Sequence, residues 1–88
     1  MKLIFADEAW EDYLHWQKRW QQQDKKMVER INKLIGEIKR DPFAGIGKPE
    51  PLKHALSGFW SRRINDEHRM VYKFEGGALL LAQLRYLY

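Results

Sequence analysis

The chain has 88 residues, 44% of them apolar and 32% charged, with a formal net charge of +4 and no cysteine. A chain of this length forms one domain around one core, and its apolar content is too high for a disordered protein. The longest apolar run, residues 78–82, is too short to span a membrane, and disulfides and thiolate metal sites are excluded. Because acidic residues follow the start too soon for a secretory signal, we expect one cytoplasmic domain over residues 1–88 with no membrane contact.

Positive charge is concentrated in the middle and second half of the chain. Residues 1–24 hold three basic and five acidic residues, residues 25–40 hold six and two, and residues 41–88 hold seven and five. This distribution suits a polyanionic partner such as nucleic acid. A solvated, lysine-rich helix face explains residues 25–40 equally well, so charge alone leaves both interpretations open.

The N-terminal quarter predicts a short strand followed by an amphipathic helix. Residues 2–5 are apolar and β-prone, and Asp7 is a suitable N-cap with further acidic residues in the first turns. Aromatic and apolar side chains recur at helical spacing from Trp10 to Trp20, which predicts about four turns whose aromatic stripe faces the core. The three glutamines at 21–23 mark the end of this helix or a junction.

The strongest helix signal lies between Asp24, a possible cap, and Pro42. From Met27 to Ile38 the apolar residues follow i, i+4, i+7, i+8, i+11 spacing, with charged residues on the other face. Proline disfavours helix at the residue before it, so this helix ends near residue 41. Residues 41–51 hold all three prolines and two glycines and predict a loop with little conformational freedom.

The remaining residues predict a sheet. Alternating side chains indicate short strands within residues 59–64, 68–74 and 78–86, a further short segment at 52–56, and a hairpin turn at 75–77. The order is β-α-α followed by three or four antiparallel strands. We therefore expect an α+β fold, with two N-terminal helices packed on one face of a twisted antiparallel sheet.

Several familiar catalytic and metal-binding patterns are absent from the sequence. There is no glycine-rich phosphate loop, and the two serines, Ser57 and Ser61, do not sit in a nucleophile elbow. His15, His54 and His68 are spaced too widely for a local metal motif. We expect neither a metal nor a cofactor.

Basic side chains gather instead on the predicted strands. Arg63 and Arg69 fall on neighbouring strands, where two guanidinium groups could converge on a phosphate. Glu50 lies between two prolines, which present its carboxylate rigidly as a candidate base. A carboxylate base and phosphate-binding arginines are sufficient for RNA cleavage without a metal. The competing interpretation is a set of surface ion pairs, in which Arg62 or Arg69 binds Asp66 or Glu67.

Four blocks of the sequence resemble a known toxin family over nearly the whole chain. They are Lys48-Pro49-Glu50-Pro51-Leu52-Lys53-His54, Ser57-Gly58-Phe59-Trp60-Ser61-Arg62-Arg63-Ile64, Glu67-His68-Arg69-Met70-Val71-Tyr72 and the terminal Arg85-Tyr86-Leu87-Tyr88. The opening residues Met1 to Ile4 and the aromatic residues of the first helix fit as well. These blocks are similar to those of YoeB toxins, which belong to the RelE-like superfamily of bacterial type II toxin–antitoxin systems.

The resemblance implies a microbial RNase-like fold and an endoribonuclease that cuts mRNA in the ribosomal A site. It also implies a cognate antitoxin similar to YefM, which inhibits the toxin and helps to repress the operon. Operator DNA would be bound only by the toxin–antitoxin complex. Some members form homodimers.

Residue roles follow from the resemblance position by position. Glu50 resembles the general base, Arg69 the arginine that stabilises the phosphate, and Tyr88 the terminal tyrosine that orients the substrate. The positions that match basic groups on the face toward RNA and the ribosome are Lys48, Lys53, His54, Arg62, Arg63 and Arg85.

The sequence departs from the family pattern in two places. Leu87 stands where the family has a histidine that protonates the leaving 5′-oxygen, which indicates an impaired enzyme. Either the natural protein has drifted, or the residue was changed so that an expression host tolerates the toxin; we favour the second. The junction between Trp16 and Lys26 also exceeds that of relatives by a few residues.

Three functions remain open on the sequence alone. The first is a ribosome-dependent mRNA interferase impaired at Leu87. The second is a non-catalytic module that binds RNA or the ribosome and blocks the A site by occupancy. The third is a protein-binding module whose basic groove holds an acidic peptide.

Overall fold

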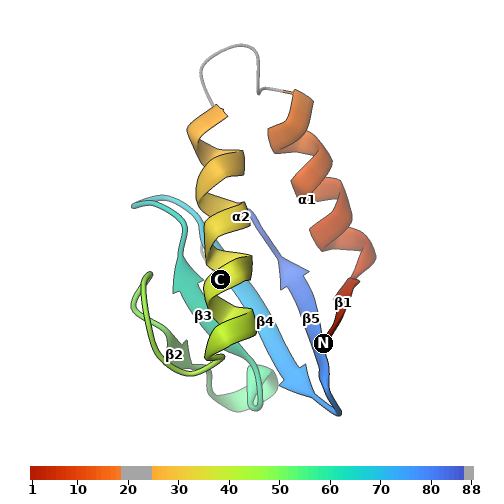
Figure 1. Ribbon diagram of the computed structural model, residues 1–88, viewed down its shortest axis with the longest axis vertical. Coiled ribbons are helices and arrows are strands. Elements are labelled where there is room, and N and C mark those ends of the chain that lie inside the picture. Colours follow the sequence, from red (N-terminus) through yellow and green to blue (C-terminus); the bar gives the residue numbers. More distant parts are fainter. Residues whose placement is uncertain (19–24, 87–88) are drawn as a thin grey trace.

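A computed structural model of the protein describes residues 1–18 and 25–86 (Figure 1). Its elements in chain order are β1 (Lys2–Phe5), α1 (Asp7–Lys18), α2 (Lys25–Arg40), β2 (Glu50–Pro51), the 3₁₀ helix η1 (His54–Leu56), β3 (Trp60–Arg63), β4 (Arg69–Glu75) and β5 (Ala78–Gln83). The predicted strand at 2–5 and the second helix are confirmed. The predicted short segment at 52–56 contains the 3₁₀ helix η1, whereas the three predicted strand segments contain β3, β4 and β5. The cap at Asp24, the glutamines at 21–23 and most of the Trp16–Lys26 junction lie outside the described residues.

The sheet has five strands in the order β1-β5-β4-β3-β2. The pairs β3–β4 and β4–β5 are antiparallel, as predicted. The strand β2, which lies within the predicted loop at 41–51, also pairs antiparallel with β3, but β1 lies parallel to β5, so the sheet is mixed. A parallel pair needs a long connection, and the chain between β1 and β5 supplies one. Strand pairing between the two ends of the chain is non-local, which is why the sequence pattern did not predict its direction.

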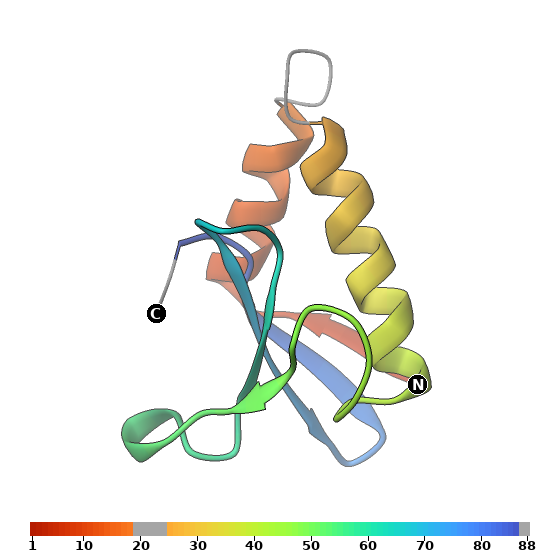
Figure 2. The ribbon, with the colours of Figure 1, turned by 90° about the vertical axis from the view of Figure 1, so that its left-hand side faces the viewer.

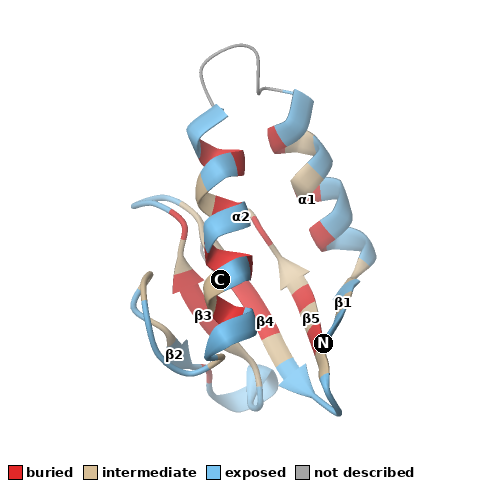
Figure 3. Cartoon of the chain, in the orientation of Figure 1, coloured by how far each residue is buried: buried red, intermediate tan, exposed pale blue. Residues whose placement is uncertain are grey.

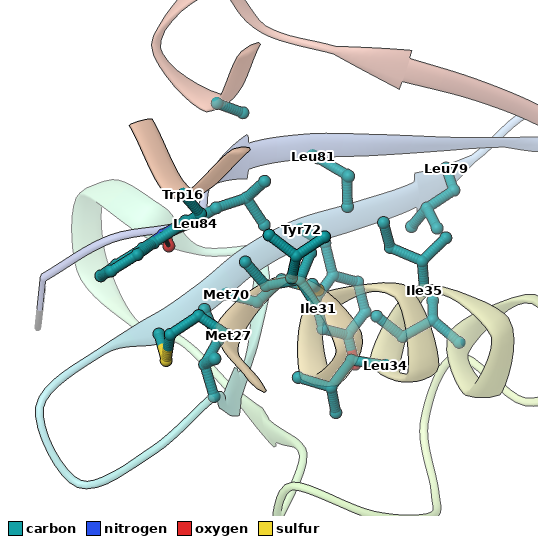
Figure 4. Packing of buried hydrophobic residues seen from close by; sticks show 14 residues of the cluster. Trp16, Met27, Ile31, Leu34, Ile35, Met70, Tyr72, Leu79, Leu81 and Leu84 are labelled. Atoms are coloured by element: carbon teal, nitrogen blue, oxygen red, sulfur yellow. Dashed lines mark hydrogen bonds between the residues drawn. The ribbon is translucent and has the colours of Figure 1, made fainter. Parts of the chain in front are cut away.

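Both helices lie on one face of this sheet (Figures 1 and 2), which confirms the predicted α+β arrangement. Figure 3 shows the buried residues on the sides of the helices that face the strands. In Figure 4, Ile31 and Leu34 of α2 pack over Met70 and Tyr72 of β4, next to Leu79 and Leu81 of β5. Burial of one such aliphatic side chain contributes about 1.5–3 kcal/mol, so this layer is the main source of stability.

The predicted hairpin turn joins β4 to β5. Gly76 and Gly77 have φ angles of +59° and +73°, and Glu75 pairs with Ala78 across the turn. Two successive positive φ angles match the twist of a two-residue hairpin, and glycine adopts them without a steric cost. The turn therefore fixes the register of the two central strands.

The outer surface of α1 carries aromatic side chains. Trp10 stacks on Tyr13 at a ring-centroid distance of 6.1 Å, and the two rings lie 5.4 and 5.7 Å from the Phe5 ring of β1. Trp10 and Leu14 are exposed, so the predicted aromatic stripe is buried only in part. Neither α1 nor α2, nor any other described helix, is long and apolar enough to cross a membrane.

Candidate active site

A cluster of three polar side chains lies at the junction of β2, β3 and β4. The Arg69 guanidinium donates from Nη2 to Glu50 Oε1 at 3.0 Å, and from Nε and Nη2 to Ser61 Oγ at 3.1 and 2.9 Å. The Arg69 side chain is 15% exposed and the Glu50 side chain 52%. The serine and the arginine are therefore held within the surface, while the carboxylate projects further into solvent.

The register of the strands explains why these side chains meet. Ser61 pairs with Glu50 on one side and with Val71 on the other, and Arg63 pairs with Arg69. Paired residues point to the same face of a sheet, and so do alternate residues of one strand. The cluster thus lies on the face opposite the core, because Met70 and Tyr72, the intervening residues of β4, pack beneath the helices.

Ser61 is a site residue that the sequence analysis missed. It is fully buried, and its hydroxyl oxygen accepts two hydrogen bonds from one guanidinium, which fixes the plane of that group. The residues around Ser61 exclude a nucleophile elbow, but they do not by themselves indicate a supporting role. The sequence does place Ser61 two residues before Arg63 on a predicted strand next to that of Arg69. Residues two apart on a strand point to the same face, so this spacing could have placed the Ser61 hydroxyl beside both arginines.

The ion pairs differ from the competing interpretation of the sequence. Asp66 binds Arg63, three residues earlier, and not Arg62 or Arg69. Arg69 binds Glu50, which is nineteen residues away and belongs to another strand. The pair of Glu50 and Arg69 therefore joins two strands, whereas the competing interpretation expects pairs between residues close in sequence.

Arg62 is not on this face, and the prediction that it contacts RNA is corrected. Its side chain is 0% exposed and faces the core, since it alternates with Ser61 and Arg63. Nε donates to the Tyr72 hydroxyl, Nη1 to the Ile46 carbonyl, and Nη2 to the carbonyls of Asp41 and Ala44. A buried charge needs such partners, and here they are the backbone of the loop that precedes β2.

Tyr72 and Gly47 complete the attachment of this loop. The Tyr72 hydroxyl donates to the Pro42 carbonyl at 2.7 Å, and burial raises the pKa of Tyr72, which favours the protonated donor. At Gly47, where φ is +85°, an added Cβ would lie 3.0 Å from Leu34 Cδ2 and 3.1 Å from Arg62 Cβ. The loop therefore lies directly against the core and brings Glu50 to β3 in one position.

The other predicted basic residues flank the cluster on two sides. Glu50, Lys53 and His54 line a shallow hollow of about 310 Å³ together with Pro51, Leu52 and Leu56. Lys48 and Arg63 line a second hollow, of about 280 Å³, which Arg30 of α2 also borders. Lys48, Lys53 and His54 are exposed, so these positions are accessible to a large ligand.

Arg85 is directed toward α1. Its Nε lies 3.4 Å from Asp12 Oδ1, and its guanidinium lies over the Tyr86 ring, 4.6 Å from the centroid. With a side chain only 26% exposed, Arg85 joins residues 84–86 to the helix layer and lines neither of these two hollows.

The described chain ends close to the cluster. The Arg69 amide donates to the Tyr86 carbonyl at 3.0 Å, which places Tyr86 beside the first residue of β4. Leu87 and Tyr88, the two predicted functional positions that follow, lie outside the described residues.

The arrangement can bind an anion and move a proton at one point. A guanidinium binds phosphate oxygens through two donors, and an adjacent carboxylate can accept a proton from a hydroxyl group of the same ligand. Within residues 1–18 and 25–86 no three histidine, aspartate or glutamate side chains are grouped as metal ligands.

Comparisons with known proteins give a consistent result. The model of a family described as the YoeB-like toxin of bacterial type II toxin–antitoxin systems matches residues 5–88. Toxin YoeB of Escherichia coli strain K12 is 57% identical to the chain over 88 residues, covering all of both chains. Toxin RelK of Mycobacterium tuberculosis is 54% identical over 84 residues, covering 96% of this chain and 94% of that protein.

Solved structures agree with these relatives. A YoeB/ParE toxin from Agrobacterium tumefaciens is 50% identical and superposes with a TM-score of 0.88 over the full length of both chains. A YoeB dimer from Staphylococcus aureus is 46% identical, with a TM-score of 0.84, and the match covers 100% of this chain and 98% of that one. The toxin chain of a heterotetrameric YoeB–YefM toxin–antitoxin complex from the same species is 46% identical, with a TM-score of 0.83, and the match covers 100% of this chain and 98% of that one.

Replacement of Arg62 tests its assignment to the interior. We expect Arg62→Lys to lower the free energy of unfolding by about 2–4 kcal/mol, because one ammonium group cannot reach all four acceptors and leaves buried carbonyls unpaired. The matched control is Arg63→Lys on the neighbouring, partly exposed position, where we expect about 0–1 kcal/mol. Denaturant unfolding of both variants measures the difference, and equal losses would contradict the assignment.

Proposed function

Since the chain belongs to the YoeB-like toxins of bacterial type II toxin–antitoxin systems and has the α+β fold of RelE-like toxins, we propose that it is a ribosome-dependent endoribonuclease. Its substrate is mRNA in the ribosomal A site, and it acts in the cytoplasm. No metal takes part in the reaction. The observation that carries the proposal is the contact of Glu50 with Arg69 on the open face of the sheet.

The chemistry begins at the 2′-hydroxyl of the nucleotide before the scissile phosphate. Glu50 accepts the proton of this hydroxyl, and the 2′-oxygen attacks phosphorus. Negative charge then develops on the phosphate oxygens, where Arg69 stabilises it more than in the ground state. The bond to the 5′-oxygen breaks, and the leaving oxygen takes up a proton.

Ser61 supports this role of Arg69. A fixed guanidinium needs no reorganisation when charge develops, and two hydrogen bonds to one buried hydroxyl hold it in plane. The more exposed Glu50 is accessible to a ribose, while the hollows with Lys53 and His54 and with Lys48 and Arg63 accommodate the flanking RNA and the ribosome. Tyr88 orients the substrate, as the family resemblance implies.

Leu87 limits the last step. An aliphatic side chain has no proton to give to the 5′-oxygen, and general acid catalysis is typically worth about 10²–10⁴-fold. The chain thus retains the groups for binding and for attack but lacks the acid, so its activity is low.

Partners follow from the relatives. Structures of the Staphylococcus aureus protein include a YoeB–YefM complex and a YoeB dimer. For this chain we propose a YefM-like antitoxin, binding to operator DNA only as the toxin–antitoxin complex, and a homodimer in the absence of antitoxin.

A second function is favoured by Leu87 itself. The residue removes the acid and leaves the basic surfaces around Glu50 intact, which suits a module that blocks the A site by occupancy alone. In vitro translation with mapping of mRNA ends separates the two functions, because only an enzyme produces new ends.

Restoring the acid tests the proposal directly. We expect Leu87→His to raise single-turnover cleavage of ribosome-bound mRNA by at least about a hundredfold, because an imidazolium can protonate the leaving oxygen. Leu87→Gln is the control, since it is polar but supplies no acid of suitable strength. Equal rates for the original chain and the histidine variant would exclude position 87 as the acid position.

The base is tested on the Leu87→His background. We expect Glu50→Gln to lower cleavage by at least about a hundredfold, because an amide keeps the shape of the side chain but does not accept the 2′-hydroxyl proton. Ribosome binding, measured by filtration or sedimentation, should remain nearly unchanged. A parallel fall of binding and cleavage would mean that Glu50 acts only as the ion-pair partner of Arg69.

Substitutions of Arg69 in the Leu87→His protein distinguish a role in catalysis from a role in surface ion pairing alone. We expect Arg69→Ala to slow cleavage strongly and Arg69→Lys to restore only part of it, because a point charge does not hold two oxygens in one plane. Ion pairing alone predicts parental cleavage and a stability change of about 0–1 kcal/mol. Thermal unfolding and single-turnover cleavage of the three proteins decide between these outcomes.

A further inference from the structure

A carboxylate outside the candidate active site is buried against the C-terminal segment. Asp12 of α1 is 3% exposed, and its Oδ2 accepts the backbone N–H of Leu84 at 3.0 Å. Its other oxygen lies 3.4 Å from Arg85 Nε. Burial of a carboxylate is costly unless it is paired, and both partners here belong to the segment that leads toward the last residues of the chain.

Trp16, one helical turn further along α1, binds the same residue. Its Nε1 donates to the Leu84 carbonyl at 3.0 Å, so the two helix side chains satisfy both backbone polar groups of Leu84. Figure 4 shows the Trp16 ring next to Leu84. The two contacts join positions 72 and 68 residues apart in sequence. We call Asp12 and Trp16 the α1 clamp.

The segment after Leu84 is held from its other side by the start of β4. The Tyr86 N–H donates to His68 Nδ1 at 2.7 Å, and the Tyr86 carbonyl accepts the Arg69 N–H at 3.0 Å. Tyr86 has a φ of +68°, in the left-handed region that bulky residues rarely adopt. Such a conformation persists only where surrounding contacts determine it, and here the contacts with His68 and Arg69 hold Tyr86 beside the first residue of β4.

We propose that Asp12 and Trp16 are positioning residues for RNA cleavage. By holding Leu84, the α1 clamp fixes Tyr86, whose carbonyl accepts the Arg69 N–H, and thereby holds the residue of β4 that carries the guanidinium of the Glu50–Arg69 pair. This inference rests on the proposed function. It assigns a catalytic contribution to two helix side chains that do not themselves contact the substrate.

The alternative is that the clamp only stabilises the fold. In that case its loss lowers the melting temperature, while molecules that remain folded cut RNA at the normal rate. A positioning role makes a different prediction, because displacement of a reacting group by about 1 Å can slow a reaction about a hundredfold without weakening binding. The rate of the chemical step at saturating ribosome concentration therefore distinguishes the two roles.

The first experiment compares two substitutions on α1, both in the Leu87→His protein. Trp16→Phe keeps an aromatic ring and removes the donor to Leu84. Tyr13→Phe is the matched control, because it also removes one donor from an aromatic side chain of α1, but its partner is Asn32 Oδ1 of α2 at 2.9 Å. We expect Trp16→Phe to slow single-turnover cleavage at least about tenfold, and Tyr13→Phe to cut at the parental rate.

The second experiment removes the contacts of Asp12 in two steps, again in the Leu87→His protein. Asp12→Asn keeps an oxygen that can accept the Leu84 N–H but gives up the charge near Arg85, whereas Asp12→Ala loses both contacts. We expect cleavage to fall in the order Asp, Asn, Ala, with the ribosome dissociation constant unchanged within about twofold. Amide hydrogen exchange should accelerate at Leu84 and Tyr86 in the same order. If Asp12→Ala does not fold, Asp12→Asn and Trp16→Phe provide the comparison.

Each outcome decides the inference. Slower cleavage with unchanged binding and faster exchange at Leu84 and Tyr86 supports it. Parental cleavage by folded Trp16→Phe and Asp12→Asn proteins overturns it. It is also overturned if cleavage falls only in proportion to ribosome binding, or if Tyr13→Phe loses cleavage to the same extent. A Leu87→His parent that binds ribosomes but cuts no mRNA overturns the proposed function, and the inference with it.

Discussion

The buried guanidinium of Arg62 is the interaction on which the geometry of the site depends. Three backbone carbonyls of the loop before β2 and the hydroxyl of Tyr72 accept its hydrogen bonds, so the loop can dock in one way only. A charge without exposure to water loses several favourable contacts at once if the loop moves away. Because Glu50 follows this loop, the position of the candidate base is set by an arginine on the opposite face of the sheet.

Two consecutive arginines on β3 therefore have different roles. Arg62 faces the core and organises the loop, whereas Arg63 faces the open side and forms an ion pair with Asp66. The alternation of a strand divides them, although their chemistry is identical. The same alternation places Ser61 where its hydroxyl orients Arg69, so one short strand supports both the loop and the candidate phosphate-binding group.

The helices contribute more than a cover for the sheet. α2 supplies the apolar layer over β4 and β5, and α1 holds the C-terminal segment through Asp12 and Trp16. The candidate site and its immediate surroundings are consequently built from three parts of the chain that are far apart in sequence: β2 with Glu50, the start of β4 with Arg69, and residues 84–86. The antiparallel strands align the first two, and α1 holds the third.

The sequence by itself determined the order of β1, the two helices and the last three strands, the helices on one face of a sheet, the hairpin at 75–77 and the candidate roles of Glu50 and Arg69. These follow from local periodicity, turn chemistry and motif resemblance, all of which can be recognised in the amino-acid sequence. Only the tertiary structure decided that β1 runs parallel to β5, that Arg62 is buried, that Ser61 binds Arg69 and that Asp12 binds Leu84. Those outcomes depend on which strands pair and which face each side chain takes, and contacts between residues up to 72 positions apart have no signature in local spacing.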